Sequence, residues 1–176
     1  MKKVILGVLC IFLAVPMAFS KNEGEGWDKI EKGWSRMPIR VYLDDTGNLT
    51  EDIKEGFQEW EDKSDDKVKF KFVTKPHSGY ANITVKVVKN FTDQTAGLTS
   101  AQMGVNKIYK STIEIGTHTP TDRPFTDAEL DIIIRHEIGH ALGLKHTNDV
   151  KSIMFPYVML GQSITSDDLE DLWELY

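Results

Sequence analysis

Residues 136–146 read His136-Glu137-Ile138-Gly139-His140-Ala141-Leu142-Gly143-Leu144-Lys145-His146. In a helix, His136 and His140 lie about one turn apart on the same face, so both imidazoles can reach one metal ion. Glu137 follows one residue later, where its carboxylate flanks the ion without having to bind it. Gly143 can adopt the left-handed conformation that ends helices. The chain can then turn back and bring His146 to the ion as a third ligand.

Three neutral histidine nitrogens and one open coordination position are typical of a catalytic zinc site. A structural zinc is usually closed by four protein ligands, often cysteines, and the single cysteine of this chain is Cys10, near the N-terminus. We therefore predict that His136, His140 and His146 bind one catalytic Zn²⁺. The alternative is a set of helical histidines whose nitrogens make hydrogen bonds within a hydrophobic core.

The segment before the histidines carries clear signals for the start of a helix. Thr126 and Glu129 have the spacing of a capping box, in which each side chain bonds the backbone N–H of the other residue. A helix that begins there and ends at Gly143 covers residues 127–142. The first two histidines are therefore expected on its last two turns.

Earlier in the chain, hydrophobic and polar residues alternate as in strands with one buried face. Three such strands are expected at residues 39–43, 67–72 and 82–87, and a fourth around residues 113–115. Between the first two strands, Thr50 is expected to cap a helix. The buried stripe of that helix is formed by Ile53, Phe57 and Trp60.

A final helix is expected from about Ser166, with acidic residues in its first turn. Its buried stripe is expected to be formed by Leu169, Leu172, Trp173 and Tyr176. The chain has 176 residues and a formal net charge of −6, which suggests one domain. An acidic chain lacks the dense basic face that binding to a phosphate backbone requires, so no nucleic-acid partner is expected.

The first 20 residues have the layout of a secretory signal peptide: two lysines, an apolar stretch, and small residues before a cleavage site after Ser20. A retained membrane anchor is the alternative, but the 15 helical residues 4–18 would span only ~22 Å of a ~30 Å hydrocarbon core. We expect residues 21–35 to be a short leader or pro-segment and residues 36–176 to be the catalytic domain. The expected location is extracellular or periplasmic, with no stable membrane anchor after cleavage.

The pattern H-E-x-x-H-x-x-G-x-x-H resembles that of the metzincin zinc peptidases. Members of that family have a methionine-containing turn beneath the zinc site, and Met154 in the sequence Ser152-Ile153-Met154-Phe155-Pro156 matches it. The similarity is greatest to matrixins, the group that contains the matrix metalloproteinases. It covers residues 34–176, including Thr147 after the third histidine and the C-terminal helix.

This resemblance implies an α+β metzincin domain. Its twisted mixed sheet would have about five strands with an antiparallel edge strand, and two long helices and a C-terminal helix would pack around it, with the zinc site in a cleft. The implied activity is that of a zinc-dependent endopeptidase in which Glu137 activates a zinc-bound water. Met154 would pack under the site.

Two other interpretations stay open. A zinc-binding pseudopeptidase or binding module would keep the metal site without turnover. A carboxylate, Glu170 or Glu174, could replace His146 as the third ligand.

By the same resemblance, Gly97, Leu98 and Thr99 belong to an edge strand whose free backbone groups pair with an extended protein or peptide substrate. Ile132 is expected in an apolar specificity pocket or, equally, in the core. The pocket wall is assigned to Pro156, Tyr157 and Val158. Matrixins usually have Pro-x-Tyr there, whereas Tyr157 follows Pro156 directly in this chain.

Other matrixin features have no evident counterpart in this sequence. The His and Asp ligands of the structural zinc, the glycine-rich calcium loop and the latency cysteine are not recognisable, so structural calcium stays undecided. We expect a monomer. In the leader, Asp28 is a candidate inhibitory ligand, and a leader without function is the alternative.

Overall fold

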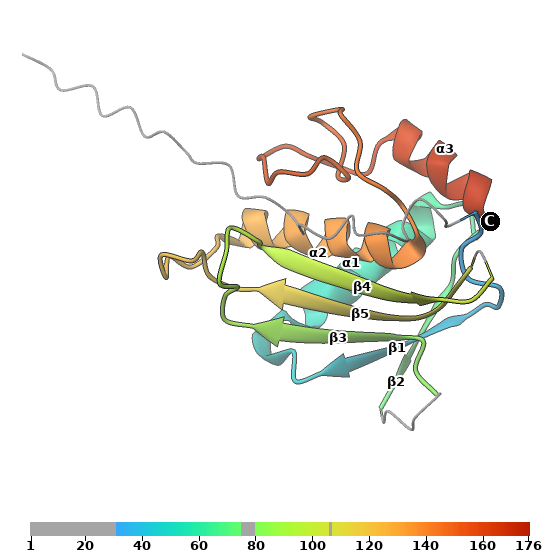
Figure 1. The fold of residues 1–176 in the computed structure, drawn as a ribbon, viewed down its shortest axis with the longest axis horizontal. Helices are drawn as coiled ribbons and strands as arrows, with labels where there is room; N and C mark the ends of the chain where they lie inside the picture. The colour runs from blue at the N-terminus through green and yellow to red at the C-terminus, as the bar shows by residue number, and fades with distance from the viewer. Residues whose placement is uncertain (1–30, 75–79, 106) are drawn as a thin grey trace, which may run out of the picture.

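The computed structural model describes residues 31–74, 80–105 and 107–176. Five strands in these ranges form one mixed sheet in the order β2-β1-β3-β5-β4 (Figure 1). Their bounds are β1 (Ile39–Asp44), β2 (Phe70–Val73), β3 (Ile83–Val88), β4 (Gly97–Met103) and β5 (Ile108–Gly116). Only the β4–β5 pair is antiparallel among these neighbours. The expected α+β fold, with a mixed sheet and an antiparallel edge strand, is confirmed.

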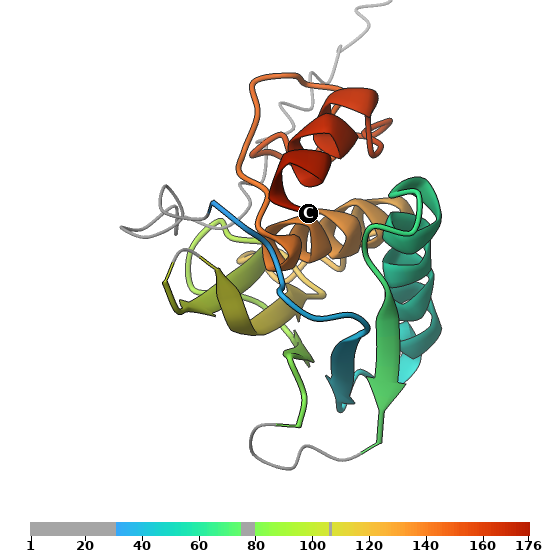
Figure 2. The same cartoon turned by 90° about the vertical axis from the view of Figure 1, so that its right-hand side faces the viewer.

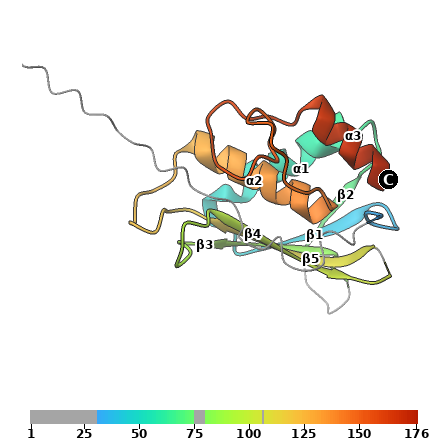
Figure 3. The same cartoon turned by 45° about the horizontal axis from the view of Figure 1, so that its top comes forward.

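Two long helices, α1 (Thr50–Lys63) and α2 (Asp127–Leu142), lie side by side on one face of the sheet (Figures 2 and 3). A third helix, α3 (Ser166–Leu175), lies beyond α2 on the side away from the sheet. The bounds of α2 and the start of α3 agree with the sequence analysis. α2 is therefore enclosed between the sheet, α1 and the C-terminal segment.

The core lies between the sheet and the two long helices. The stripe of α1 is completely covered, because Ile53, Phe57 and Trp60 are at most 1% exposed. The sheet contributes alternate side chains from its central strands, namely Ile39, Val41, Ile83, Val85, Ile113 and Ile115. From residue 132 to residue 142 every side chain of α2 except Arg135 is buried, which fits its enclosed position.

The prediction that Thr50 caps α1 is wrong. A short 3-10 turn, η2 (Gly47–Leu49), runs directly into α1, so Thr50 is the first helical residue and Leu49 occupies the cap position. The Thr50 hydroxyl donates to the carbonyl oxygen of Gly47, which precedes it in the chain, at 2.8 Å. Thr50 therefore closes the 3-10 turn instead of capping the helix.

The second strand is shorter than predicted. Residues 67–72 were expected to form it, but β2 begins at Phe70. The Phe70 N–H donates to the Glu61 carboxylate of α1 at 2.9 Å, and Val68 is buried before the strand begins. The connection from α1 thus continues to Lys69, tied to the helix by side-chain contacts.

The two ends of the described chain meet at the C-terminal end of α2. The Trp34 indole N–H donates to the Ala141 carbonyl oxygen, and the Tyr176 hydroxyl donates to that of Leu142, both at 2.9 Å. The predicted signal peptide lies outside the described residues. Within those residues, no helix has the length and apolar character needed to cross a membrane.

Candidate metal centre

Local sequence explains how α2 carries the histidines. Its start is fixed by the predicted capping box, in which Thr126 accepts from the Glu129 N–H and the Glu129 carboxylate accepts from the Thr126 N–H. Its end is fixed by Gly143, which has φ 107° and whose N–H donates to the His140 carbonyl oxygen. The chain reverses at this point and brings His146 back towards the helix.

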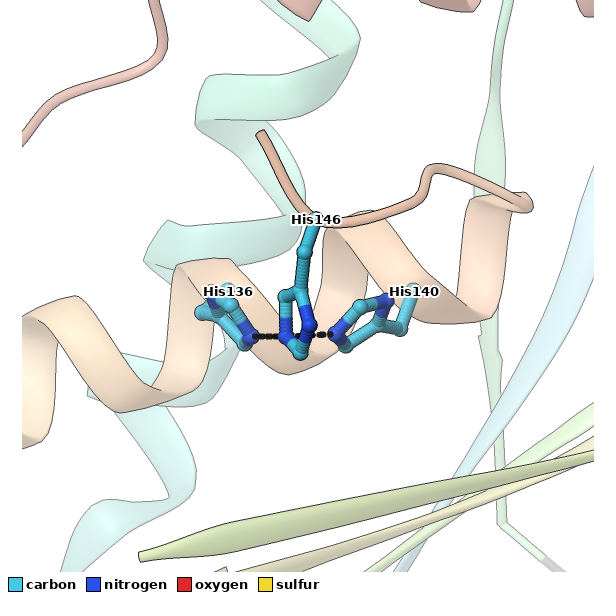
Figure 4. A group of neighbouring side chains, drawn as sticks. All are labelled: His136, His140 and His146. Carbon is cyan, nitrogen blue, oxygen red and sulfur yellow. Dashed lines mark hydrogen bonds between the residues drawn. The ribbon is translucent and has the colours of Figure 1, made fainter. Parts of the chain in front are cut away.

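Figure 4 shows the three imidazoles directed at one another, His136 and His140 from α2 and His146 from the following loop. The His146 Nε2 atom lies 3.2 Å from the Nε2 of His136 and 3.1 Å from the Nε2 of His140. One ligand atom from each residue lies within 4.8 Å of the others. The structure therefore brings together the three predicted ligands.

The other ring nitrogens determine the tautomers of the first two histidines. Nδ1 of His136 lies 2.7 Å from the Ile153 carbonyl oxygen, and Nδ1 of His140 lies 2.9 Å from that of Leu144. Because a carbonyl oxygen only accepts, each Nδ1 carries the hydrogen and each Nε2 presents a lone pair.

The Nε2 atoms of His136 and His140 thus present their lone pairs towards His146. A cation between the three nitrogens would satisfy them all, and carbonyl-oriented imidazoles are typical of zinc ligands. The donor set therefore fits a zinc ion.

Burial also keeps these ligands in the form that binds metal. His136 is fully buried and His140 is 5% exposed. Desolvation, with repulsion from the neighbouring imidazoles, lowers the pKa of His136 well below its ordinary value and that of His140 to about 3. Both imidazoles are neutral at physiological pH, and protons compete weakly with a metal ion for them.

Glu137 points into the interface between α2 and β4. Its side chain is fully buried, and its Oε2 atom lies 2.6 Å from the Thr99 hydroxyl. Its Oε1 atom has no hydrogen-bond partner among the described residues. Desolvation raises the pKa of Glu137 to about 8, although the Thr99 bond acts in the opposite direction. This carboxyl group can therefore hold or release a proton near neutral pH.

Met154 lies against α2 at Gly139. A side chain at Gly139 would collide with the Met154 sulfur, so these two residues are in close contact. The Thr147 N–H donates to the Met154 carbonyl oxygen at 3.1 Å, which ties the loop after His146 to the methionine turn. The Ser152 hydroxyl accepts from the Met154 N–H and donates to the buried Asp168 carboxylate.

The residues predicted to bind substrate do not all come together. Gly97 and Thr99 are buried against Glu137, while Leu98 is half-buried. Ile132 lines a cavity of about 430 Å³, together with other residues of α2, Glu59 and residues 160–163. The predicted pocket wall, Pro156, Tyr157 and Val158, is not among the residues that line this cavity. Tyr157 is 40% exposed, and Val158 packs against the hydrophobic core.

Thr99 was predicted only to pair through its backbone, but its hydroxyl also contacts Glu137. These residues are 38 positions apart. Alternation within the strand places Gly97 and Thr99 on one face, but no local signal identifies the partner of that face.

A family model described as Matrixin matches residues 42–176. The chain belongs to the matrixin family. This membership confirms the resemblance and implies a catalytic zinc, for which the three histidines form a possible site. Curated relatives of this matrixin include Matrix metalloproteinase-16 of Rattus norvegicus, 34% identical over 71 residues, and Macrophage metalloelastase of Oryctolagus cuniculus, 40% identical over 58 residues.

The matched segments cover 34% and 31% of this matrixin but only 12% of either relative. Similar solved structures include High choriolytic enzyme 1, a hatching enzyme zinc-protease from Oryzias latipes, and Archaemetzincin from Methanopyrus kandleri. Each is 15% identical, with TM-scores of 0.47 and 0.46. The alignments cover 90% and 78% of this matrixin and 98% and 95% of those chains.

Proposed function

We propose that this matrixin is a secreted zinc-dependent endopeptidase. The observation that carries the proposal is the convergence of three histidine Nε2 atoms on one point, with two of the rings oriented by carbonyl oxygens. His136, His140 and His146 would hold the ion. Neither Glu170, which is exposed, nor Glu174 belongs to this group.

When bound by the three histidines, a zinc ion would act as a Lewis acid that polarises a peptide carbonyl and lowers the pKa of water. Glu137 is the proton carrier of the proposed reaction. Its carboxylate takes a proton from the attacking water as the oxygen bonds to the carbonyl carbon, and it delivers that proton to the leaving amine as the C–N bond breaks. Glu137 ends in its initial state, and the products are a carboxylic acid and an amine.

The substrate is proposed to lie extended along β4. This strand is at the edge of the sheet, with β5 on one side and no strand on the other among the described residues. An extended peptide can pair with the backbone of Gly97, Leu98 and Thr99, whatever its side chains are. Selectivity is assigned to side-chain pockets, for which Ile132 and residues 156–158 are the candidates.

Replacement of Glu137 by Gln tests the mechanism. The variant keeps the size and one hydrogen-bond acceptor but cannot carry the proton, so cleavage of a proteome-derived peptide library should fall by about 10²–10⁴-fold. Zinc content should stay at one ion per chain. Glu170→Gln is the matched control, because Glu170 is exposed on α3, and its activity should be unchanged.

Cleavage by Glu137→Gln at the wild-type rate would contradict the role of Glu137, and loss of zinc from Glu170→Gln would favour the carboxylate ligand. A zinc-binding module without turnover is the second candidate function. The complete burial of Glu137 is the observation that favours this second function. Wild-type protein that binds one zinc and cleaves nothing in the library would establish it.

Secretion is part of the proposal and rests on residues 1–20. We propose that residues 21–35 are a leader before a catalytic domain over residues 36–176, and that its residues Gly33 and Trp34 bond to α3 and α2 of that domain. We propose that the mature protein is monomeric and has no membrane anchor. N-terminal sequencing of exported protein should give Lys21 as the first residue, and a retained Met1 would contradict cleavage.

A further inference from the structure

We propose that Thr99 of the edge strand β4 is a positioning residue that holds the Glu137 carboxylate for proton transfer. The proposal rests on the function proposed above, because it assigns a means of orientation to the residue that carries the proton. Thr99 is 3% exposed, and Glu137 is fully buried. The contact between them is therefore shielded from water.

The Thr99 hydroxyl lies between two oxygens of the same residue. Its Oγ1 atom is 2.6 Å from Oε2 of Glu137 and 3.0 Å from the backbone carbonyl oxygen of Glu137. A hydroxyl has one hydrogen to donate, and an ionised carboxylate can only accept. With Glu137 ionised, the shorter contact is therefore a charge-assisted bond from Thr99 to Oε2.

This bond is the contact that orients the carboxylate. The other oxygen, Oε1, has no hydrogen-bond partner within the described part of the chain. Because Thr99 bonds Oε2 while Oε1 has no bond to any described residue, the two oxygens differ in their surroundings.

The same strand leaves space for the carboxylate. Gly97 lies two residues before Thr99 and faces α2 as well, and a Cβ atom placed on Gly97 would come 2.6 Å from both Cγ and Oε1 of Glu137. β4 is held in register by β5, with Gly97 opposite Ile115 and Thr99 opposite Ile113. A fixed strand thus supplies both the gap and the hydrogen bond.

A simpler interpretation is that Thr99 is a buried hydroxyl satisfied by the helix carbonyl. The two interpretations differ in what happens when the hydroxyl is removed. A purely structural role would affect stability alone, whereas a positioning role would lower turnover and leave substrate binding and zinc content unchanged.

The experiment compares Thr99→Val, which keeps the side-chain shape without the hydroxyl, with Thr99→Ser, which keeps the hydroxyl. In the zinc enzyme, kcat of Thr99→Val should fall at least tenfold with KM within twofold of wild type and one zinc per chain. Thr99→Ser should retain kcat within about threefold. Thr112→Val is the matched control, because Thr112 lies on β5 in a half-buried position, and its kcat should match that of wild type.

A second measurement uses metal-free protein and does not depend on enzyme activity. Thr99→Val should lower the thermal midpoint more in the wild-type background than in a Glu137→Ala background, where Oε2 is absent. Equal shifts in both backgrounds would show that the hydroxyl serves only the helix carbonyl and would overturn the proposal. This cycle remains decisive if Thr99→Val is too unstable to assay as an enzyme at the usual temperature.

Gly97→Ala provides an independent variant that displaces the carboxylate while Thr99 is intact, and its kcat should also fall at least tenfold. If the wild-type protein is active and kcat of Thr99→Val is undiminished, the positioning role is overturned and the proposed function still stands. A wild type without any cleavage would instead refute the proposed function, and the metal-free cycle would still report on the Thr99–Glu137 contact.

Discussion

At the residue scale, the site combines buried groups whose pKa values move in opposite directions. Burial favours neutral imidazoles at His136 and His140, which lowers their pKa values, and favours a neutral carboxyl group at Glu137, which raises its pKa. The same desolvation therefore prepares two side chains to bind a cation and a third to exchange a proton. These properties depend on burial, which the residue pattern alone did not quantify.

The stability of the metal-free protein should consequently pass through a maximum between about pH 6 and 7. Below 6.5 the unfolded chain protonates both histidines while the folded chain does not, so the free energy of unfolding falls as pH falls. Between 4.5 and about 8 the folded chain holds the Glu137 proton that the unfolded chain has lost, so this group makes the free energy of unfolding fall as pH rises.

Below 6.5 the two histidines outweigh the single carboxyl group. Denaturant titrations of metal-free protein from pH 5 to 9 measure both slopes. Glu137→Gln should remove the decline between pH 7 and 8, which amounts to at most about 1.4 kcal/mol per pH unit for one proton. An unchanged decline in this variant would contradict the raised pKa of Glu137.

At the scale of elements, α2 is fixed at both ends by local chemistry. The capping box at Thr126 and the left-handed Gly143 were recognisable from sequence because each involves residues only a few positions apart. The 3-10 turn before α1 was not recognisable, since Thr50 fits a cap and a first helical position equally well. The contact of Thr99 with Glu137 could not be predicted, because the pairing of β4 with β5 and the packing of α2 create it.

Gly143→Ala should weaken both the fold and the metal site. A side chain at φ 107° costs about 1–2 kcal/mol of stability, and relaxation of the turn would displace His146, three residues later. We expect zinc affinity to fall at least tenfold in a chelator competition assay. Gly104→Ala is the matched control, because its added Cβ atom would lie 3.9 Å from Tyr109 and its φ is not in the left-handed region. Equal zinc affinity in the two variants would contradict this account.

At the scale of the whole molecule, the two ends of the described chain stabilise the helix that carries the site. The Gly33 N–H donates to the Leu175 carbonyl oxygen at 3.0 Å, while Trp34 and Tyr176 bond the last carbonyls of α2. These carbonyls belong to the final turn of a helix, where intrahelical partners are lacking. The alternation of residues predicted the sheet, but it gave no indication that both ends meet at α2.

Tyr176→Phe should therefore destabilise the protein although it changes one atom at the last residue. Removal of the hydroxyl leaves the Leu142 carbonyl oxygen without this donor, which should lower the free energy of unfolding by about 1 kcal/mol. Tyr109→Phe is the matched control, because Tyr109 is 55% exposed, and it should be neutral. Identical denaturation midpoints for the two variants would show that the Tyr176 bond does not contribute.

We propose that one zinc ion is held by three histidines at the end of α2. Anomalous diffraction from crystals of the zinc-loaded protein, recorded on both sides of the zinc absorption edge, locates the ion directly. We expect one strong peak per chain, bonded to the Nε2 atoms of His136, His140 and His146. A peak that lacks any of these three nitrogens, or that includes a carboxylate of Glu170 or Glu174 in place of His146, would contradict it.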